Sequence, residues 1–209
     1  MKKFIIAVAV FLATAFFLPV VRAAAEENKD GTSIKECRIW VIKDINRDEV
    51  EKQFLEPIQN CPEEQRVKLL VDSMGGDGFV SSLMFTAVRD IFNRKIDTHI
   101  VHSAMSAGVI VALAGEHKTM AEDARIYFHP IMVTVDDKVL VNPSQVPLNM
   151  RRDASKLEEM ALEDYVHFIT RRSKITKKEL LKMMKNHTSL SAEEALRYGL
   201  IDEVTKANW

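Results

Sequence analysis

A serine, a histidine and a pair of glycines stand out as residues that could do chemistry together. Ser106 lies among small residues and is followed by an apolar run at 109–114. His129 and the pair Gly75-Gly76 each follow a short apolar stretch of the kind that forms buried strands. A histidine that takes the proton of a serine hydroxyl makes that oxygen a nucleophile, and backbone amides can bind the oxyanion that forms. These residue types therefore indicate acyl transfer.

Each of these residues also has a simpler interpretation. A serine before a buried helix is commonly its N-cap, and glycines after a strand commonly form an ordinary turn. A single histidine at a strand end commonly has no catalytic role. The catalytic interpretation therefore depends on whether the fold brings the three segments together.

Strands and helices alternate along the chain, which predicts an α/β fold with a mainly parallel sheet built from βαβ units. The expected strands are 38–45, 67–71, 98–101, 118–120 and 124–128. The expected helices include 48–60, 79–93, 177–185, 191–198 and one long, highly charged helix at 148–172. Because the carboxyl ends of parallel strands share one sheet edge, the glycine pair, Ser106 and His129 are expected at that edge.

The composition excludes several classes of function. Of 209 residues, 47% are hydrophobic and 28% charged, which is typical of a folded globular protein. The formal net charge of −1 gives no reason to expect a nucleic-acid partner. No glycine-rich phosphate loop is present, and two cysteines are too few for a zinc finger, so we expect neither cofactor nor metal.

The first residues have the layout of a secretory signal peptide. Basic residues open the chain, the segment 4–21 is almost wholly apolar, and small residues follow up to Ala25. We expect a cleaved signal peptide at 1–25, with cleavage after Ala23 or Ala25; an uncleaved membrane anchor is the alternative. In both cases the protein is exported, to the periplasm if the source is a Gram-negative bacterium. A flexible arm is expected at 26–37 and the folded domain at 38–209.

Export changes how the two cysteines are interpreted. Cys37 and Cys61 each precede an expected strand, 38–45 and 67–71. If these strands are parallel neighbours, both cysteines lie at the same edge of the sheet. In an oxidising compartment we therefore expect a Cys37–Cys61 disulfide.

Four motifs, in this order, resemble the family of the Clp protease proteolytic subunit, ClpP, which has the ClpP/crotonase-like fold. They are Ser-Met-Gly-Gly at 73–76, Ala-Met-Ser-Ala-Gly at 104–108, Phe-His-Pro at 128–130 and the block Leu-Ser-Ala-Glu-Glu-Ala-Leu-Arg-Tyr-Gly-Leu-Ile-Asp at 190–202. The family usually has a proline where Met74 stands. The resemblance covers roughly 38–204, most of the chain after the expected leader.

The resemblance implies a serine endopeptidase that works through an acyl-enzyme. Ser106 matches the nucleophile and His129 the general base, while the amides of Gly76 and Ala107 match the donors of the oxyanion hole. Residues 38–209 are then a ClpP-like serine peptidase domain. Related signal-peptide peptidases and membrane-linked peptidases of this fold use a serine–lysine pair instead, for which Lys118 and Lys138 would be candidates; His129-Pro130 favours the histidine scheme.

The third member of the triad departs from the family pattern. The family has an aspartate shortly before the Leu-Ser-Ala block, and counting back from that block reaches His187, with Asn186 beside it. His187 or Asn186 could orient His129, or an acidic side chain such as Asp136 or Asp137 could reach in. The remaining alternative is an inactive ClpP-fold protein that binds peptides or acts as a scaffold.

The long helix and the compartment determine the expected partners. In ClpP the corresponding helix is the handle through which rings stack, so we expect a homo-oligomer of undetermined size. A turn-rich insert at 141–147 precedes the helix here. An exported protein has no ATP supply, so we expect no ATPase partner and ATP-independent cleavage of peptides or unfolded protein segments.

Overall fold

The computed structural model describes residues 23–27, 33–135, 138–140 and 151–206. The strands are β1 (Ala23–Glu27), β2 (Ser33–Ile45), β3 (Arg66–Gly76), β4 (Ile96–Met105), β5 (Lys118–Ala121), β6 (Arg125–Tyr127), β7 (Val133–Val135), β8 (Lys138–Leu140), β9 (Ser189–Leu190) and β10 (Glu203–Thr205). The helices are α1 (Arg47–Val50), α2 (Glu56–Asn60), α3 (Gly78–Thr86), α4 (Ala107–Ala112), α5 (Arg151–Arg171), α6 (Lys177–Lys185) and α7 (Ala192–Arg197), with π-helical segments η1 (Glu51–Leu55) and η2 (Ala87–Ile91).

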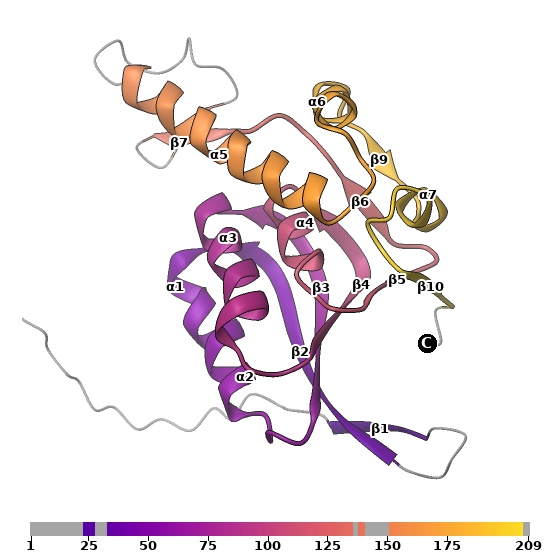
Figure 1. Ribbon diagram of the computed structural model, residues 1–209. Coiled ribbons are helices and arrows are strands. Elements are labelled where there is room, and N and C mark those ends of the chain that lie inside the picture. Colours follow the sequence, from indigo (N-terminus) through magenta and orange to yellow (C-terminus); the bar gives the residue numbers. More distant parts are fainter. Residues whose placement is uncertain (1–22, 28–32, 136–137, 141–150, 207–209) are drawn as a thin grey trace, which may run out of the picture.

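The main sheet has the order β1-β2-β3-β4-β5-β10, and β6 pairs with both β4 and β9. The pairs β1–β2 and β6–β9 are antiparallel, and the other pairs of this sheet are parallel. From β2 to β5 each strand is added on the same side of the one before it. Right-handed crossovers then place all the connecting helices on one face of the sheet, as Figure 1 shows for α1 to α4. The predicted α/β fold with a mainly parallel sheet is confirmed.

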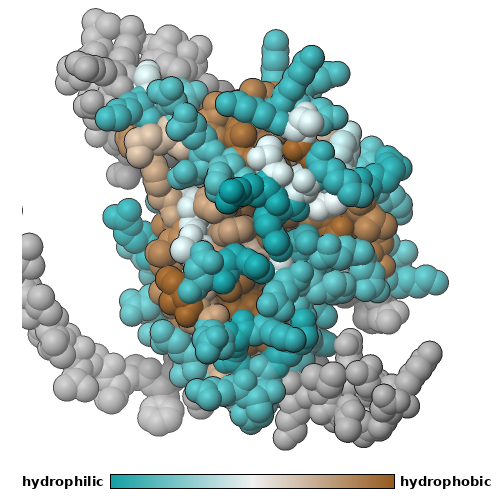
Figure 2. Space-filling model, in the orientation of Figure 1, coloured by the Kyte–Doolittle hydropathy of each residue, from teal (hydrophilic) through white to brown (hydrophobic). Residues whose placement is uncertain are grey.

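Alternate strand residues face these helices and form the core. Ile39 and Val41 of β2 and Leu69 and Val71 of β3 are buried against helical side chains such as Phe54. The apolar run 109–114 is wholly buried, as a helix between the sheet and its neighbours should be. The space-filling view shows hydrophobic residues reaching the surface in separate patches, one of them over α1 and α3 (Figure 2).

The segment 26–37, expected to be a flexible arm, contains two paired strands. Glu26 and Glu27 belong to β1, and residues 33–37 begin β2, so the described part of this segment is an antiparallel strand pair. Backbone hydrogen bonds hold these two strands together. The residues of β1 do not alternate between apolar and polar, so the sequence pattern did not predict a strand there. The predicted leader lies outside the described residues up to residue 22, and both predicted cleavage points, Ala23 and Ala25, lie in β1. In the described part of the chain, no helix is long and apolar enough to cross a membrane.

The predicted disulfide is present. Cys37 of β2 and Cys61, which follows α2, are bonded with their Cα atoms 6.0 Å apart. Arg94 holds the same loop through its guanidinium, which donates to four backbone carbonyls, those of Ile58, Cys61, Pro62 and Gln65. The loop between α2 and β3 is therefore fixed by one covalent bond and one cation.

Replacing Cys37 and Cys61 together with alanine should lower the free energy of unfolding by about 3 kcal/mol, because the bridge closes a loop of moderate length. The sequence separation is 24 residues. Urea denaturation measures the effect. A reductant should lower the midpoint of the wild type towards that of the variant and leave the variant unchanged. A wild-type midpoint that does not respond to reductant would contradict the bridge.

Candidate active site

Ser106 lies at the turn between β4 and α4 in an unusual backbone conformation. Its φ is 48° and its ψ is −123°, a region that costs a residue other than glycine on the order of 1–3 kcal/mol. It occupies the N-cap position of α4, but its side chain makes no capping hydrogen bond. The simpler interpretation of Ser106 as a helix N-cap is therefore not supported. A strained, half-exposed serine between a strand and a helix is the arrangement of a nucleophile elbow.

The turn is possible because Gly75 lies directly against it. A Cβ atom on Gly75 would lie 2.8 Å from Cβ of Ser106, 2.9 Å from the carbonyl oxygen of Met105 and 3.3 Å from the amide nitrogen of Ala107. Gly76 packs elsewhere, since a Cβ there would lie 2.2 Å from the carbonyl oxygen of Ile45. The glycine pair thus joins the end of β3 to the Ser106 turn on one side and to β2 on the other.

The pairing of β4 with β6 brings the segment that precedes His129 next to the Ser106 turn. Met105 is the partner of Tyr127 in this register, and the Ser106 amide donates to the Tyr127 carbonyl at 3.1 Å. His129 follows two residues later and is half-buried. Within the described residues its ring makes no hydrogen bond to the Ser106 hydroxyl. Such bonds are often long in unliganded enzymes and tighten when substrate binds.

The tautomer of His129 follows from its own backbone neighbour. Nδ1 lies 2.6 Å from the carbonyl oxygen of Pro130. A carbonyl can only accept, so Nδ1 carries the proton and Nε2 has a free lone pair. This is the tautomer that a general base facing a serine requires.

His187 lies near His129 along the backbone, but its ring has another partner. The β6–β9 register pairs Tyr127 with Ser189, and continuing it by two residues places His187 opposite His129. The ring of His187 instead shares a hydrogen bond of 3.0 Å with the Tyr127 hydroxyl. Tyr127 lies between the two histidine rings, at centroid distances of 5.9 Å and 6.3 Å. In the described part of the chain, the expected contact of His187 with His129 is absent.

The end of α6 explains why His187 points away. The φ angle of His187 is 51°. The amide of His187 donates to the carbonyl of Met184, and the amide of Thr188 donates to the carbonyl of Met183. This is a Schellman motif, which places His187 in the left-handed conformation. Asn186 is the exposed C-cap of the same helix. Tyr127, which was not predicted, could have been found from strand periodicity, because residues 127 and 129 share one face of an extended segment.

Comparison with known proteins decides the family. A sequence profile of the Clp protease family matches residues 27–208. This chain belongs to the Clp protease family. The ATP-dependent Clp protease proteolytic subunit of Deinococcus radiodurans is 28% identical over 149 residues, which are 68% of this chain. They are 65% of the relative, so the match spans slightly less than two thirds of its length.

A solved structure of a ClpP1 mutant from Listeria monocytogenes has the same fold. It superposes with a TM-score of 0.64 at 16% sequence identity, and the match covers 82% of this chain and 92% of that one. The resemblance to the Clp protease family that the motifs indicate is thus confirmed, and so is the fold class.

Two other sets of candidate residues can now be placed. Lys118 of β5 is held by both carboxylate oxygens of Asp202, at 3.0 and 2.8 Å, so it is not a base for Ser106 in this Clp protease family member. The side chain of Lys138 and residues Asp136 and Asp137 lie outside what the structure describes. No group of three or more His, Cys, Asp or Glu residues that could hold a metal ion is found among the described residues.

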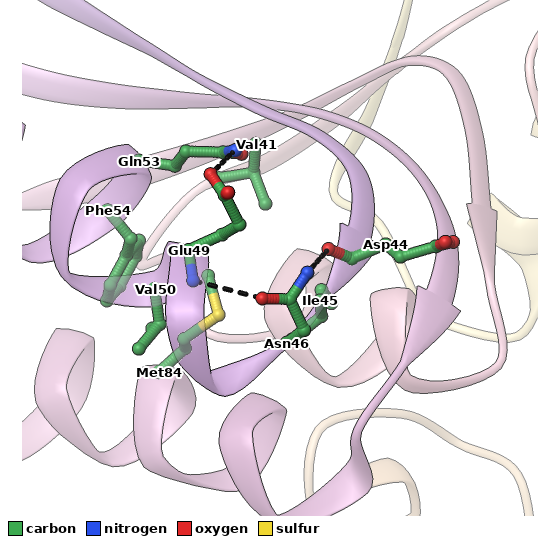
Figure 3. A pocket seen from close by; sticks show the side chains of 9 residues that line it. All are labelled: Val41, Asp44, Ile45, Asn46, Glu49, Val50, Gln53, Phe54 and Met84. Atoms are coloured by element: carbon green, nitrogen blue, oxygen red, sulfur yellow. Dashed lines mark hydrogen bonds between the residues drawn. The ribbon is translucent and has the colours of Figure 1, made fainter. Parts of the chain in front are cut away.

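A small pocket lies beside the candidate site. It is lined by Val41, Asp44, Ile45, Asn46, Glu49, Val50, Gln53, Phe54 and Met84 (Figure 3). Ile45, whose backbone contacts Gly76, forms part of its wall. Its volume of about 20 Å³ has room for about one water molecule. This pocket is too small to hold a substrate side chain.

Proposed function

We propose that this chain is an exported serine endopeptidase of the Clp protease family that cleaves peptides or unfolded protein segments without ATP. The observation that carries the proposal is the Ser106 turn. Its backbone is strained and its hydroxyl does not cap α4. Gly75 lies so close to the turn that any side chain at position 75 would collide with it. Strain of this kind persists where function requires it.

In the proposed reaction His129 activates Ser106. Nε2 of His129 takes the hydroxyl proton while Oγ attacks the peptide carbonyl, and the electron pair of the C=O bond moves to the oxygen. The amides of Ala107 and Gly76 are proposed to stabilise this oxyanion. His129 then gives its proton to the leaving amine, which leaves an acyl-enzyme on Ser106. Water, deprotonated by Nε2, hydrolyses the ester.

The hydrogen-bond partner of His129 determines the turnover rate that we expect. The Pro130 carbonyl fixes the tautomer of His129, but it is neutral. A carboxylate in that place would also stabilise the imidazolium that forms during attack. We therefore expect turnover that is slower than that of a serine peptidase with a complete Ser-His-Asp triad.

The proposed compartment and assembly rest on two segments. The basic and apolar start of the chain supports export to the periplasm through a cleaved signal peptide, and export supports cleavage without an ATPase. Leu157 and Met160 are exposed on α5, and Figure 1 shows one end of that helix reaching past the sheet. Exposed apolar residues on a projecting helix support self-association through α5.

Fluorophosphonate labelling tests the proposal. The purified protein should form a covalent adduct on Ser106, and Ser106→Ala should abolish it, because Ser106 is the proposed nucleophile. Ser189→Ala, a change at an exposed serine of β9, should leave labelling unchanged. Intact-mass spectrometry measures the adduct. A folded wild type that stays unlabelled would count decisively against the peptidase.

A peptide-binding or scaffold protein is the second candidate. The observation that favours it is the absence, in the described residues, of both a Ser106–His129 hydrogen bond and a carboxylate on His129. Such a protein would bind unfolded casein with the same affinity in the wild type and in Ser106→Ala, and it would not cleave casein on long incubation. Cleavage that disappears in Ser106→Ala would exclude this candidate.

A further inference from the structure

A buried tyrosine of α5 touches the backbone of the candidate nucleophile. The hydroxyl of Tyr165 donates to the carbonyl oxygen of Ser106 at 3.1 Å. Tyr165 is only 4% exposed, and burial raises the pKa of its phenol. The hydroxyl therefore remains a donor throughout the working pH range. The Val109 amide donates to the same carbonyl at 3.0 Å, so both acceptor positions of this oxygen are used.

The Ser106 carbonyl and the Ala107 amide belong to one planar peptide unit. In a trans peptide the C=O and N–H bonds point in opposite directions. A contact that holds the Ser106 carbonyl towards Tyr165 therefore holds the Ala107 N–H on the other side of the turn, where Gly75 lies. Ala107 carries one of the two proposed oxyanion donors.

We infer that Tyr165 is a positioning residue, which orients the Ala107 N–H by holding the carbonyl of the peptide bond between Ser106 and Ala107. The inference rests on the proposed function. A peptide unit next to a strained residue has an alternative rotation available, and a donor rotated away from the oxyanion gives little stabilisation.

A second contact keeps α5 in place against α4. Arg172, directly after α5, donates from Nε to the Leu113 carbonyl at 3.1 Å and from Nη2 to the Gly115 carbonyl at 2.6 Å. The α5 segment thus binds the start of α4 through Tyr165 and its end through Arg172. The phenol cannot move along α4 while the guanidinium holds the other end.

Tyr165→Phe tests the inference, because it keeps the ring and removes only the donor. The kcat for cleavage of labelled casein should fall about tenfold to a hundredfold with KM unchanged, since the donor acts on the transition state. Tyr198→Phe, at the C-cap of α7, is the matched control and should retain full activity. Thermal unfolding checks that both variants are folded.

A spectroscopic measurement separates this inference from the proposed function. Labelling with ¹³C-carbonyl serine and ¹⁵N-alanine selects the three Ser-Ala pairs of the chain, Ser103-Ala104, Ser106-Ala107 and Ser191-Ala192. The Ala107 amide signal, identified by its loss in Ser106→Ala, should shift in Tyr165→Phe and not in Tyr198→Phe. An unchanged signal or an unchanged kcat in folded Tyr165→Phe would overturn the inference. If the wild type lacks activity, the proposed function fails and the Ala107 signal alone decides the role of Tyr165.

Discussion

Gly76→Ala is expected to destabilise the protein by about 3 kcal/mol or more. Gly76 has a φ of 131°, and an added Cβ would lie 2.2 Å from the oxygen, 2.7 Å from the nitrogen and 2.9 Å from the carbonyl carbon of Ile45. All three are backbone atoms of β2, which pairs with Gly76 in the sheet. The clash cannot be relieved by turning a side chain. Chemical denaturation measures the loss.

Gly78→Ala is the matched control for this prediction. Gly78 begins α3, and an added Cβ would meet no atom within 4 Å. Alanine also restricts the unfolded chain, so the variant should be as stable as the wild type or more stable by about 0.4–1 kcal/mol. Equal stability of the two variants would show that the β2–β3 contact at Gly76 is not as close as described.

His129→Gln is expected to slow the acylation of Ser106 by a factor on the order of 10² to 10⁴, the usual contribution of a general base. Glutamine keeps a polar group of similar reach but cannot take the proton. The rate of fluorophosphonate labelling checks this, because the attack of the Ser106 oxygen on phosphorus uses the same base as its attack on a peptide carbonyl.

His187→Gln separates the two histidines. Because the ring of His187 forms its hydrogen bond with the Tyr127 hydroxyl and not with His129, this variant should change the labelling rate by no more than a few-fold. A loss as large as that of His129→Gln would contradict the described geometry and restore His187 as the third member of a triad. Equal rates for His129→Gln and the wild type would remove His129 from the mechanism.

Some features of the candidate site could be predicted from the sequence and others could not. The position of Ser106 between a strand and a helix follows from pattern, because small residues precede a buried apolar run. Its positive φ does not follow, since serine has no preference for that region. The close approach of this turn to Gly75 does not follow either, because Gly75 belongs to another strand.

The histidines show the same limit in another form. Counting back from the Leu-Ser-Ala block reached His187 as the residue at the family's aspartate position, and the β6–β9 register, continued by two residues, brings its backbone opposite His129. The direction of a ring depends on which neighbour offers the better hydrogen bond, and here Tyr127 and the Pro130 carbonyl do so. Tyr165 was not predicted because its contact joins residues 59 apart. On α5 it has the pattern of an ordinary core position.

The fold was more predictable than its edges. The central strands β2 and β3 carry the apolar runs 39–42 and 69–71, which are typical of a buried parallel sheet. The edge segments β9 and β10 have only two and three residues, and they pair with β6 and β5, which are distant in the sequence. The sequence pattern therefore predicted the central strands of the sheet and missed the short strands at its edges.

The two contacts of α5 with α4 have a consequence for how a substrate would complete the site. Tyr165 and Arg172 hold opposite ends of the short helix α4, which begins directly after the candidate nucleophile Ser106. His129 lies two residues beyond the end of β6. The residue before it, Phe128, still donates a backbone hydrogen bond to the carbonyl of Thr188. Of the two side chains of the proposed mechanism, Ser106 thus lies on an element that is held at both ends, whereas His129 lies beyond the end of its strand. In the proposed peptidase, the Ser106–His129 hydrogen bond would therefore form when a bound peptide shifts His129 towards Ser106.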